Sequence, residues 1–380
     1  MARKDGESQN IEHTDEHVAA NPAADGIYQS TLLSYGECRM SRTIRLLSIV
    51  FVLPLALALA VACSGPSAAT APASGSTQAN APASSAGQPT QAAAPAKKAV
   101  VMGLSISNLS FPWQKLLTDA SVAAIKAGGG QSIVLDSQGK VDKQNSDIED
   151  LITKKVDIIL LNANDGKAVV PAVLEANKAN IPVIATSRRV EGGTVAQFIS
   201  NDNVKAGLLA AQRLEAKIQG KAEVALIEGT PGNSSASDRT QGFTQEVKNH
   251  PDFTLVYDRP GNFDRATALN LTEDLLQAHP NVKGIFYEND DMAIGGLQAI
   301  QSAGKLGKIE VVSNDGIQDG LQAIKDGKLD ATIFNDAVSI GKISVDSAFK
   351  IVAGQKVESY VSPPMPVIDK STVDKYLTTK

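Results

Sequence analysis

The regular alternation of apolar runs and amphipathic segments from Ala99 onward constrains the fold more than any other feature of the sequence. Segments such as the one carrying Ile148, Leu151 and Ile152 place their apolar residues on one face of a helix. Strands that are apolar on both sides, each followed by a helix, are typical of parallel sheets covered by helices on both faces. The part from Ala99 onward, about 280 residues, is long enough for two such domains. We therefore predict an α/β fold with two doubly wound, Rossmann-like lobes. The expected strands include 100–104, 133–135, 157–161, 181–185, 224–227 and 285–287.

Residues 1–39 show no such pattern. They are polar and offer almost nothing apolar to bury, so we expect them to be disordered and not structural. A secretory signal pattern begins only at Met40, which suggests that translation starts there. His13 and His17 fit the H-x-x-E-H spacing of a class of zinc peptidases, but without apolar neighbours we interpret the match as chance.

The next two segments predict export. An apolar run at 46–62 follows two arginines and ends in small residues directly before Cys63, so we expect a signal peptide at 40–63. The cysteine position resembles the lipobox of bacterial lipoproteins, which predicts lipidation of Cys63. A single membrane anchor is the alternative, since the run is near the lower length limit for a span. Residues 64–98 are rich in Ala, Pro, Ser, Thr and Gln, and we expect a flexible tether.

Composition argues against several functional classes. A formal net charge of −5 disfavours nucleic acid as a partner. The two cysteines, Cys38 and Cys63, both precede the alternating part, so that part has no disulfide, thiol nucleophile or Cys-ligated metal. It contains no phosphate-binding loop, nucleophile elbow or EF-hand pattern. We therefore predict no enzyme activity, no cofactor and no metal.

The segment 282–295 predicts where a ligand would bind. A buried strand is followed by polar residues and then by a second helical pattern. We expect Asp290 or Asp291 to cap that helix, which leaves Asn289 at the carboxyl end of the strand, where open α/β sheets bind ligands. An amide with one acceptor and two donors suits a hydroxyl-rich ligand. A polar turn without function is the alternative.

Similar polar residues follow most of the other predicted strands. Amides, carboxylates, guanidinium groups and aromatic rings at one edge of each sheet suit a polyhydroxylated ring, although any one of them could instead serve as a cap or turn residue. The set includes Ser105, Asn108, Phe111, Trp113, Asn162, Asn164, Asp165, Ser187, Arg188, Arg189, Asp238, Arg239, Phe263, Asp264, Ser313, Asn314, Asp315, Asn335 and Asp336.

A series of motifs between Ala99 and Asp369 occurs in a familiar order. They are Val134-Leu135-Asp136-Ser137-Gln138, Ala179-Asn180-Ile181-Pro182-Val183-Ile184, Ser200-Asn201-Asp202-Asn203, Asn262-Phe263-Asp264-Arg265, Ala278-His279-Pro280, Asn289-Asp290-Asp291-Met292-Ala293, Asp315-Gly316 and Asp326-Gly327-Lys328-Leu329. In these motifs the chain resembles the type I solute-binding proteins of ABC sugar importers, the family of the periplasmic ribose-binding proteins. The resemblance implies a monomer with two lobes, 99–203 plus 336–362 and 204–335 plus 363–380. It also implies three hinge crossovers near Asn203, Asn335 and Ser362, with closure on the ligand.

The resemblance also implies the ligand contacts. Carried over by these motifs, the family's sugar contacts fall on Arg188, Arg239, Phe263, Asn289, Asp315 and Asn335. The sequence departs from the ribose-binding pattern at Phe111, Trp113, Gln114 and Ser187, and it has Asn335 in place of a glutamine. A sugar receptor is therefore predicted, but ribose is not singled out.

The implied function is an extracytoplasmic receptor that delivers a monosaccharide or polyol to an ABC permease. A sensory or chemotaxis receptor would use the same binding chemistry and is the alternative. A repressor with this core would carry a helix-turn-helix segment where this chain has a signal and a tether.

Ser187 replaces an aspartate of the ribose-type site. The positive charges of Arg188 and Arg239 are then opposed by only one negative charge, that of Asp315. Asp238 or Glu288 could restore the balance around a neutral sugar, and a sugar acid is the alternative ligand.

Overall fold

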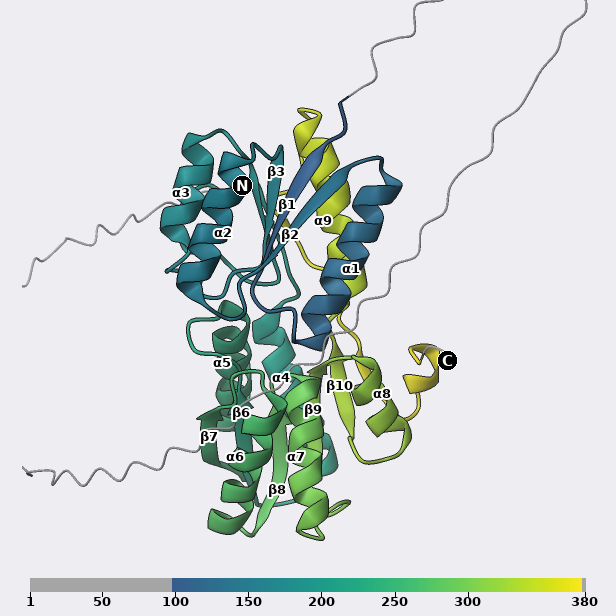
Figure 1. Ribbon diagram of the computed structural model, residues 1–380. Helices are drawn as coiled ribbons and strands as arrows, with labels where there is room; N and C mark the ends of the chain where they lie inside the picture. Colours follow the sequence, from purple (N-terminus) through teal and green to yellow (C-terminus); the bar gives the residue numbers. More distant parts are fainter. Residues whose placement is uncertain (1–97, 378–380) are drawn as a thin grey trace, which may run out of the picture. The chain divides into compact units, whose positions relative to one another are not determined.

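The computed structural model describes residues 98–377, which form two α/β lobes, each built on its own six-stranded sheet (Figure 1). The predicted signal at 40–63 with Cys63, and the two histidines near the start of the chain, lie outside these residues. Within the described part, no helix is both long enough and apolar enough to cross a membrane.

The first lobe has strand order β11-β5-β4-β3-β1-β2, and all neighbouring strands are parallel. Helices α1 and α9 pack together on one face and α2 and α3 on the other. The strand β3 is fully buried because its side chains alternate between the two apolar clusters under these helix pairs. The elements are β1 (Val101–Ile106), α1 (Pro112–Ala127), β2 (Gln131–Asp136), α2 (Val141–Thr153), β3 (Ile158–Leu161), α3 (Val170–Lys178), β4 (Val183–Thr186), β5 (Gln197–Ile199), α9 (Ala337–Val352) and β11 (Tyr360–Val361).

The second lobe repeats this plan with strand order β12-β10-β9-β8-β6-β7. Only β12 runs antiparallel to its neighbour in this sheet. Helices α4 and α5 cover one face, and α6, α7 and α8 cover the other. The elements are α4 (Asn203–Lys217), β6 (Ala222–Glu228), α5 (Ser234–Asn249), β7 (Phe253–Pro260), α6 (Arg265–Ala278), β8 (Val282–Tyr287), α7 (Asp290–Ser302), β9 (Glu310–Asp315), α8 (Gln318–Lys325), β10 (Ala331–Phe334), β12 (Val367–Asp369) and a final 3₁₀ turn (Val373–Lys375).

The chain passes between the two sheets three times, from β5 to α4, from β10 to α9 and from β11 to β12. The predicted fold class, two parallel-sheet lobes joined by three crossovers, is confirmed. The short strand β5, which lies between β4 and the edge strand β11, was not predicted. The sequence analysis also placed Ser313 to Asp315 after a strand, but they are its last residues. Because these residues are polar, the sequence analysis took them for a loop, but they are buried and form the end of β9.

Two glycines bring α4 and α5 into close contact. A Cβ atom on Gly207 would lie 2.0 Å from the carbonyl oxygen of Arg239, and one on Gly242 would lie 1.9 Å from that of Val204. Larger residues cannot replace these glycines without pushing the helices apart. This contact fixes the position of α5, and therefore of the Arg239 side chain that α5 carries toward the site.

Candidate functional site

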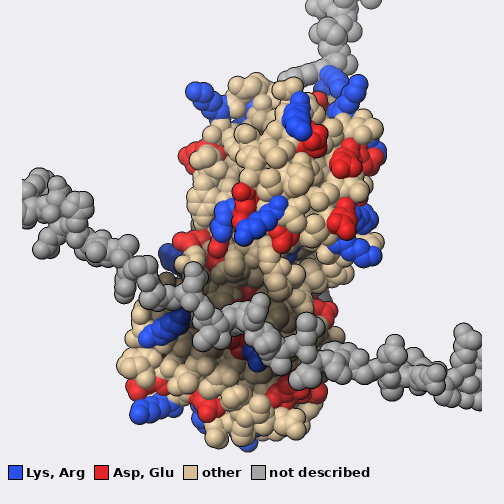
Figure 2. All heavy atoms as spheres, turned by 90° about the vertical axis from the view of Figure 1, so that its left-hand side faces the viewer, with Lys and Arg blue, Asp and Glu red and all other residues tan. Residues whose placement is uncertain are grey.

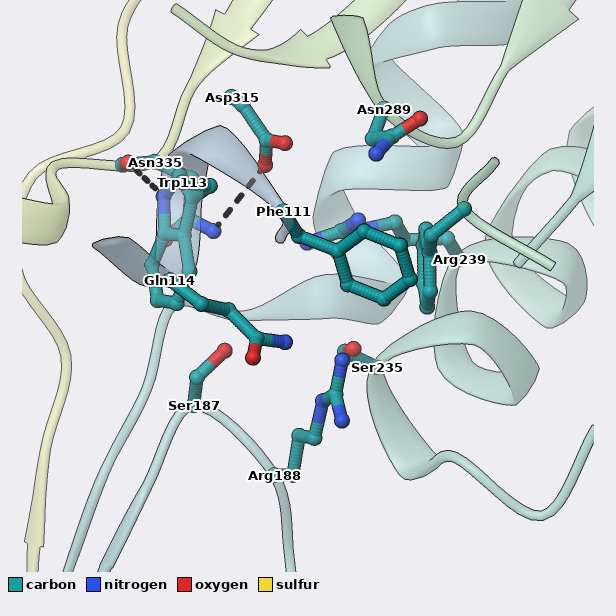
Figure 3. A pocket seen from close by; sticks show the side chains of 11 residues that line it. Phe111, Trp113, Gln114, Ser187, Arg188, Ser235, Arg239, Asn289, Asp315 and Asn335 are labelled. Atoms are coloured by element: carbon teal, nitrogen blue, oxygen red, sulfur yellow. Dashed lines mark hydrogen bonds between the residues drawn. The ribbon is translucent and has the colours of Figure 1, made fainter. Parts of the chain in front are cut away.

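A pocket lies where the carboxyl ends of the two sheets face each other, and its empty volume is about 340 Å³, part of it open to solvent (Figures 2 and 3). Every residue that the sequence analysis assigned to the ligand lies on its wall, and Ser235 joins them. The wall consists of Phe111, Trp113, Gln114, Ser187, Arg188, Ser235, Arg239, Phe263, Asn289, Asp315 and Asn335.

Strand β4 positions Ser187 and Arg188 on one side of the pocket, opposite Asp315 and Asn289 (Figure 3). Ser187 has a φ of 63°, a left-handed conformation that is uncommon for a residue other than glycine. Its backbone N–H donates to the carbonyl oxygen of Ile199 at 2.7 Å, which holds the turn in place. Two other pocket residues, Phe263 at 58° and Asp315 at 130°, also have positive φ. Strained backbone of this kind is concentrated at ligand-binding sites in proteins.

Arg188 is buried, and its side chain makes one hydrogen bond within the described residues, from Nη1 to the carbonyl oxygen of Ala163 at 2.9 Å. Burial, with the nearby positive charge of Arg239, lowers its pKa to about 9. The guanidinium carbon lies 5.7 Å from the centre of the Phe263 ring. Arg188 therefore stays charged at neutral pH. Its other guanidinium N–H groups have no protein acceptor among the described residues and can donate to a molecule in the pocket.

Gln114 presents an amide donor to the pocket. Its Oε1 accepts from Ser107 Oγ at 2.6 Å and from the backbone N–H of Asn108 at 2.9 Å. These bonds fix the orientation of the amide, and no protein acceptor within the described residues takes its Nε2. In Figure 3 this nitrogen points toward the middle of the pocket.

Asn289 lines the pocket and also caps a helix, and the sequence analysis predicted only its place at the site. Its Oδ1 accepts from the backbone N–H of Met292 at 2.9 Å, so Asn289 itself caps α7. The prediction that Asp290 or Asp291 would be the cap was wrong. An amide can cap through its oxygen and still donate from its nitrogen, and Asn289 Nδ2 is left for the pocket.

The two aspartates after Asn289 stabilise the second lobe instead. Buried Asp290 accepts from Thr332 Oγ1 at 2.8 Å and from the backbone N–H groups of Gly316 and Ile317 at 2.7 and 2.8 Å, and Ser313 also donates to it. These bonds tie the end of β8 to the turn after β9. Asp291 forms an ion pair with Arg265.

Asp315 and Asn335 supply the acceptors of the pocket. Asp315 Oδ1 accepts from Asn314 Nδ2 at 2.9 Å and from Asn335 Nδ2 at 3.4 Å. Burial raises the pKa of Asp315 to about 7, although the positive charge of Arg239 opposes this shift. The buried Oδ1 of Asn335 has no hydrogen-bond partner within the described residues. An unpaired buried acceptor is costly, so a ligand donor at this atom would be favourable.

Arg239 reaches the pocket from α5 and is held by two hydrogen bonds. Its Nε donates to Asn203 Oδ1 at 3.0 Å and its Nη1 to the carbonyl oxygen of Glu288 at 2.5 Å. The carboxylate of Glu288 lies behind the pocket wall and accepts from Gly229 N–H and Thr240 Oγ1 at 2.6 and 2.8 Å. Burial raises the pKa of Glu288 to about 8.

Three aromatic side chains line the pocket. Phe111 comes from the first lobe but packs against the apolar cluster of the second. Phe263 covers Gly229, where a Cβ atom would lie 2.1 Å from its ring. The indole Nε1 of Trp113 donates to the carbonyl oxygen of Asn335 at 2.7 Å, across the crossover from β10 to α9. The apolar faces of a ligand ring could pack against these side chains.

The rim of the pocket joins the lobes directly. Arg189 donates from Nη1 and Nη2 to the two carboxylate oxygens of Asp238 at 2.9 and 3.1 Å. The backbone N–H of Arg189 also donates to Ser234 Oγ at 2.7 Å, and that of Gly166 to the carbonyl oxygen of Gly232 at 3.3 Å. The two lobes are therefore in direct contact at the rim of the pocket.

Several residues of the predicted strand-end set do not reach the pocket. The suggestion that Asp238 caps α5 or balances the pocket arginines is wrong, because it pairs with Arg189 and Asn233 is the cap. Asp264 and Asp336 cap α6 and α9. The remaining ones contribute to turns and to bonds within a lobe. They are Ser105, Asn108, Asn162, Asn164, Asp165, Ser313 and Asn314.

Comparison with known proteins places this geometry in a family. The family model described as "Periplasmic binding protein domain" matches residues 102–356. The chain belongs to this family. A ribose import binding protein of Bacillus subtilis is 38% identical over 269 residues, which cover 71% of this chain and 87% of that protein.

Solved structures of periplasmic binding proteins agree with this assignment. An ABC transporter solute-binding protein of Mycobacterium smegmatis with bound glycerol has a TM-score of 0.71 and 32% identity, covering 74% of this chain and 98% of that one. A periplasmic solute-binding protein of Actinobacillus succinogenes with bound D-allose has a TM-score of 0.70 and 30% identity, covering 73% and 100%. The two-lobed architecture is thus that of a periplasmic binding protein.

Proposed function

We propose that the chain is an extracytoplasmic receptor that holds one monosaccharide or polyol in the pocket between its lobes and delivers it to an ABC permease. The single observation that carries this proposal is the wall of the pocket, where aromatic faces lie beside amide and guanidinium donors that no described protein group accepts. Aromatic planes bind the C–H faces of a sugar ring, while planar polar groups bind its hydroxyl groups.

The relatives support the same ligand class. They include a protein named for ribose import and solute-binding proteins solved with glycerol and with D-allose. A role in catalysis has no such support, since neither cysteine nor histidine lines the pocket. The import relatives also favour a permease over a sensory kinase as the partner of this chain.

Thermal unfolding of the purified protein with a panel of monosaccharides, polyols and sugar acids tests the ligand class. A ligand that binds only the folded state raises Tm, by an amount that grows with its concentration relative to Kd. We expect a small subset of the panel to stabilise the protein, and Phe263→Ala to weaken that effect by about 1 kcal/mol of binding free energy. A panel without any stabilising member would contradict the proposal.

The location of the receptor follows from the first part of the chain. We propose export directed by residues 40–63, lipidation of Cys63, and a tether at 64–98 that keeps the binding lobes near the membrane. Expression from Met40 should give normal export. Mass spectrometry of the mature protein should find a lipidated Cys63 as its first residue, and an unmodified amino terminus further along would contradict lipidation.

A further inference from the structure

The charges on the pocket wall do not cancel. Arg188 and Arg239 both line it and are buried, whereas Asp315 is its only carboxylate. Neither arginine forms an ion pair with any carboxylate of residues 98–377; both donate to carbonyl or amide oxygens instead. Buried charge is costly unless it is paired. We infer that the ligand is a sugar acid, and that Arg188 and Arg239 hold its single carboxylate. This inference rests on the proposed function of the pocket.

No other carboxylate can take this role. Asp238 is engaged by Arg189 at the rim. The carboxylate of Glu288 bonds to a backbone N–H and a threonine behind the wall, and only its carbonyl oxygen meets Arg239. Asp290 lies within a network of backbone and hydroxyl donors in the second lobe. The positive charge therefore faces the pocket without a partner from residues 98–377.

The hydrogen-bonding groups of the pocket show the same imbalance. Four side chains have donors that no described protein group accepts, namely Gln114 and Asn289 through their amide nitrogens and the two arginines through their remaining N–H groups. The unpaired acceptors are fewer, chiefly Asn335 Oδ1 and the second oxygen of Asp315. A hydroxyl group can donate as well as accept, but a carboxylate only accepts. A donor-rich pocket is suited to a ligand that carries a carboxylate.

A carboxylate fits better than a phosphate. With Asp315 in its ionised form, one negative charge on the ligand balances the two guanidinium groups and this aspartate, whereas a phosphate monoester carries between one and two negative charges near neutral pH. Aldonic and uronic acids are the classes of sugar that carry one carboxylate.

Calorimetric titration of the purified full-length protein with matched ligands tests the inference. The pairs are D-ribose with D-ribonate and D-galactose with D-galacturonate, and D-ribose 5-phosphate is the phosphate probe. We expect one acid to bind at least about tenfold more tightly than its neutral partner, which corresponds to about 1.4 kcal/mol. Its affinity should fall as ionic strength rises.

A matched pair of variants at Ser187 tests the charge argument. Asp and Asn both tolerate the left-handed backbone at this position, so the two variants differ mainly in charge. Ser187→Asp should remove the preference for the acid, because it supplies the missing negative charge beside Arg188. Ser187→Asn should keep the ratio of acid to neutral affinity. Thermal unfolding of both variants establishes that they are folded.

The outcomes separate this inference from the proposed function. Tighter binding of a neutral sugar, or equal binding of both partners, would overturn the sugar-acid assignment and leave the sugar receptor intact. Tightest binding of the phosphate would overturn the choice of a carboxylate. If no member of any pair binds, both the inference and the proposed function fail. A Ser187→Asp variant that keeps the acid preference would refute the charge argument.

Discussion

Asn289 offers a way to separate a structural role from a binding role at one residue. Its Oδ1 caps α7 through Met292 N–H at 2.9 Å, and its Nδ2 is left for the pocket. Replacement by alanine removes both atoms, whereas serine keeps an oxygen that can cap a helix but has no amide nitrogen. Asn289→Ala should therefore lose stability and affinity together. Asn289→Ser should lose mainly affinity.

The structure sets the size of both effects. Loss of an N-cap costs about 1 kcal/mol of unfolding free energy, so Asn289→Ala should be less stable by roughly that amount and Asn289→Ser by much less. Loss of one neutral hydrogen bond to the ligand costs about 0.5–1.5 kcal/mol, which corresponds to about a twofold to twelvefold rise in Kd for both variants.

Urea unfolding without ligand measures the first effect, and calorimetric titration measures the second. If Asn289→Ser has the stability and the affinity of the unsubstituted protein, the amide nitrogen does not contact the ligand. If Asn289→Ser is as unstable as Asn289→Ala and binds as weakly, then Asn289 does not stabilise the protein through the helix cap.

Three further perturbations address the rim, the aromatic wall and the buried acid. Arg189→Gln and Asp238→Asn should each weaken ligand binding by up to about fivefold, since partly exposed ion pairs contribute about 0.2–1 kcal/mol; Asp119→Asn in the exposed pair on α1 should leave Kd unchanged. Trp113 is the only tryptophan, so ligand binding should shift the emission of the protein, and constant emission at saturation would place the ligand away from it. Burial raises the pKa of Glu288 from 4.5 to about 8, so the folded state keeps a proton that the unfolded state releases. The unfolding free energy should fall as pH rises through this window, and Glu288→Gln should reduce that slope in urea unfolding.

The fold was predictable because it depends on patterns that recur along the chain. Strands such as β3 and β8 are apolar on both faces, and the helices between them have one apolar face, which together specify covered parallel sheets. Since the carboxyl ends of parallel strands meet at one edge of a sheet, the strand-end residues of each lobe could be assigned to one edge of that lobe. Ser187 and Asn289 lie in different lobes, and their assignment to one pocket depended on the resemblance to the sugar-binding family. The short β5 lacks such a pattern, and for that reason it was missed.

The details of the site were less predictable because they depend on choices between equivalent polar groups. Asn289 and Asp290 are both good caps in sequence, and only the buried network around Asp290 decides between them. Ser235 was missed because it follows another serine at the start of α5, and nothing local shows which one faces the pocket. The one available signal was its position after a strand-end loop. The pairing of Asp238 with Arg189 joins two lobes, which no local pattern could show.

A crystal structure of the protein with its bound ligand tests the central claim most directly. The account predicts one sugar-sized molecule between the lobes, with a ring face against Phe111 or Phe263 and polar atoms within hydrogen-bonding distance of Gln114 Nε2, Asn289 Nδ2 and the Arg188 guanidinium. The claim would be contradicted by a ligand bound outside this pocket, or by one that lies in it without contacting these donors.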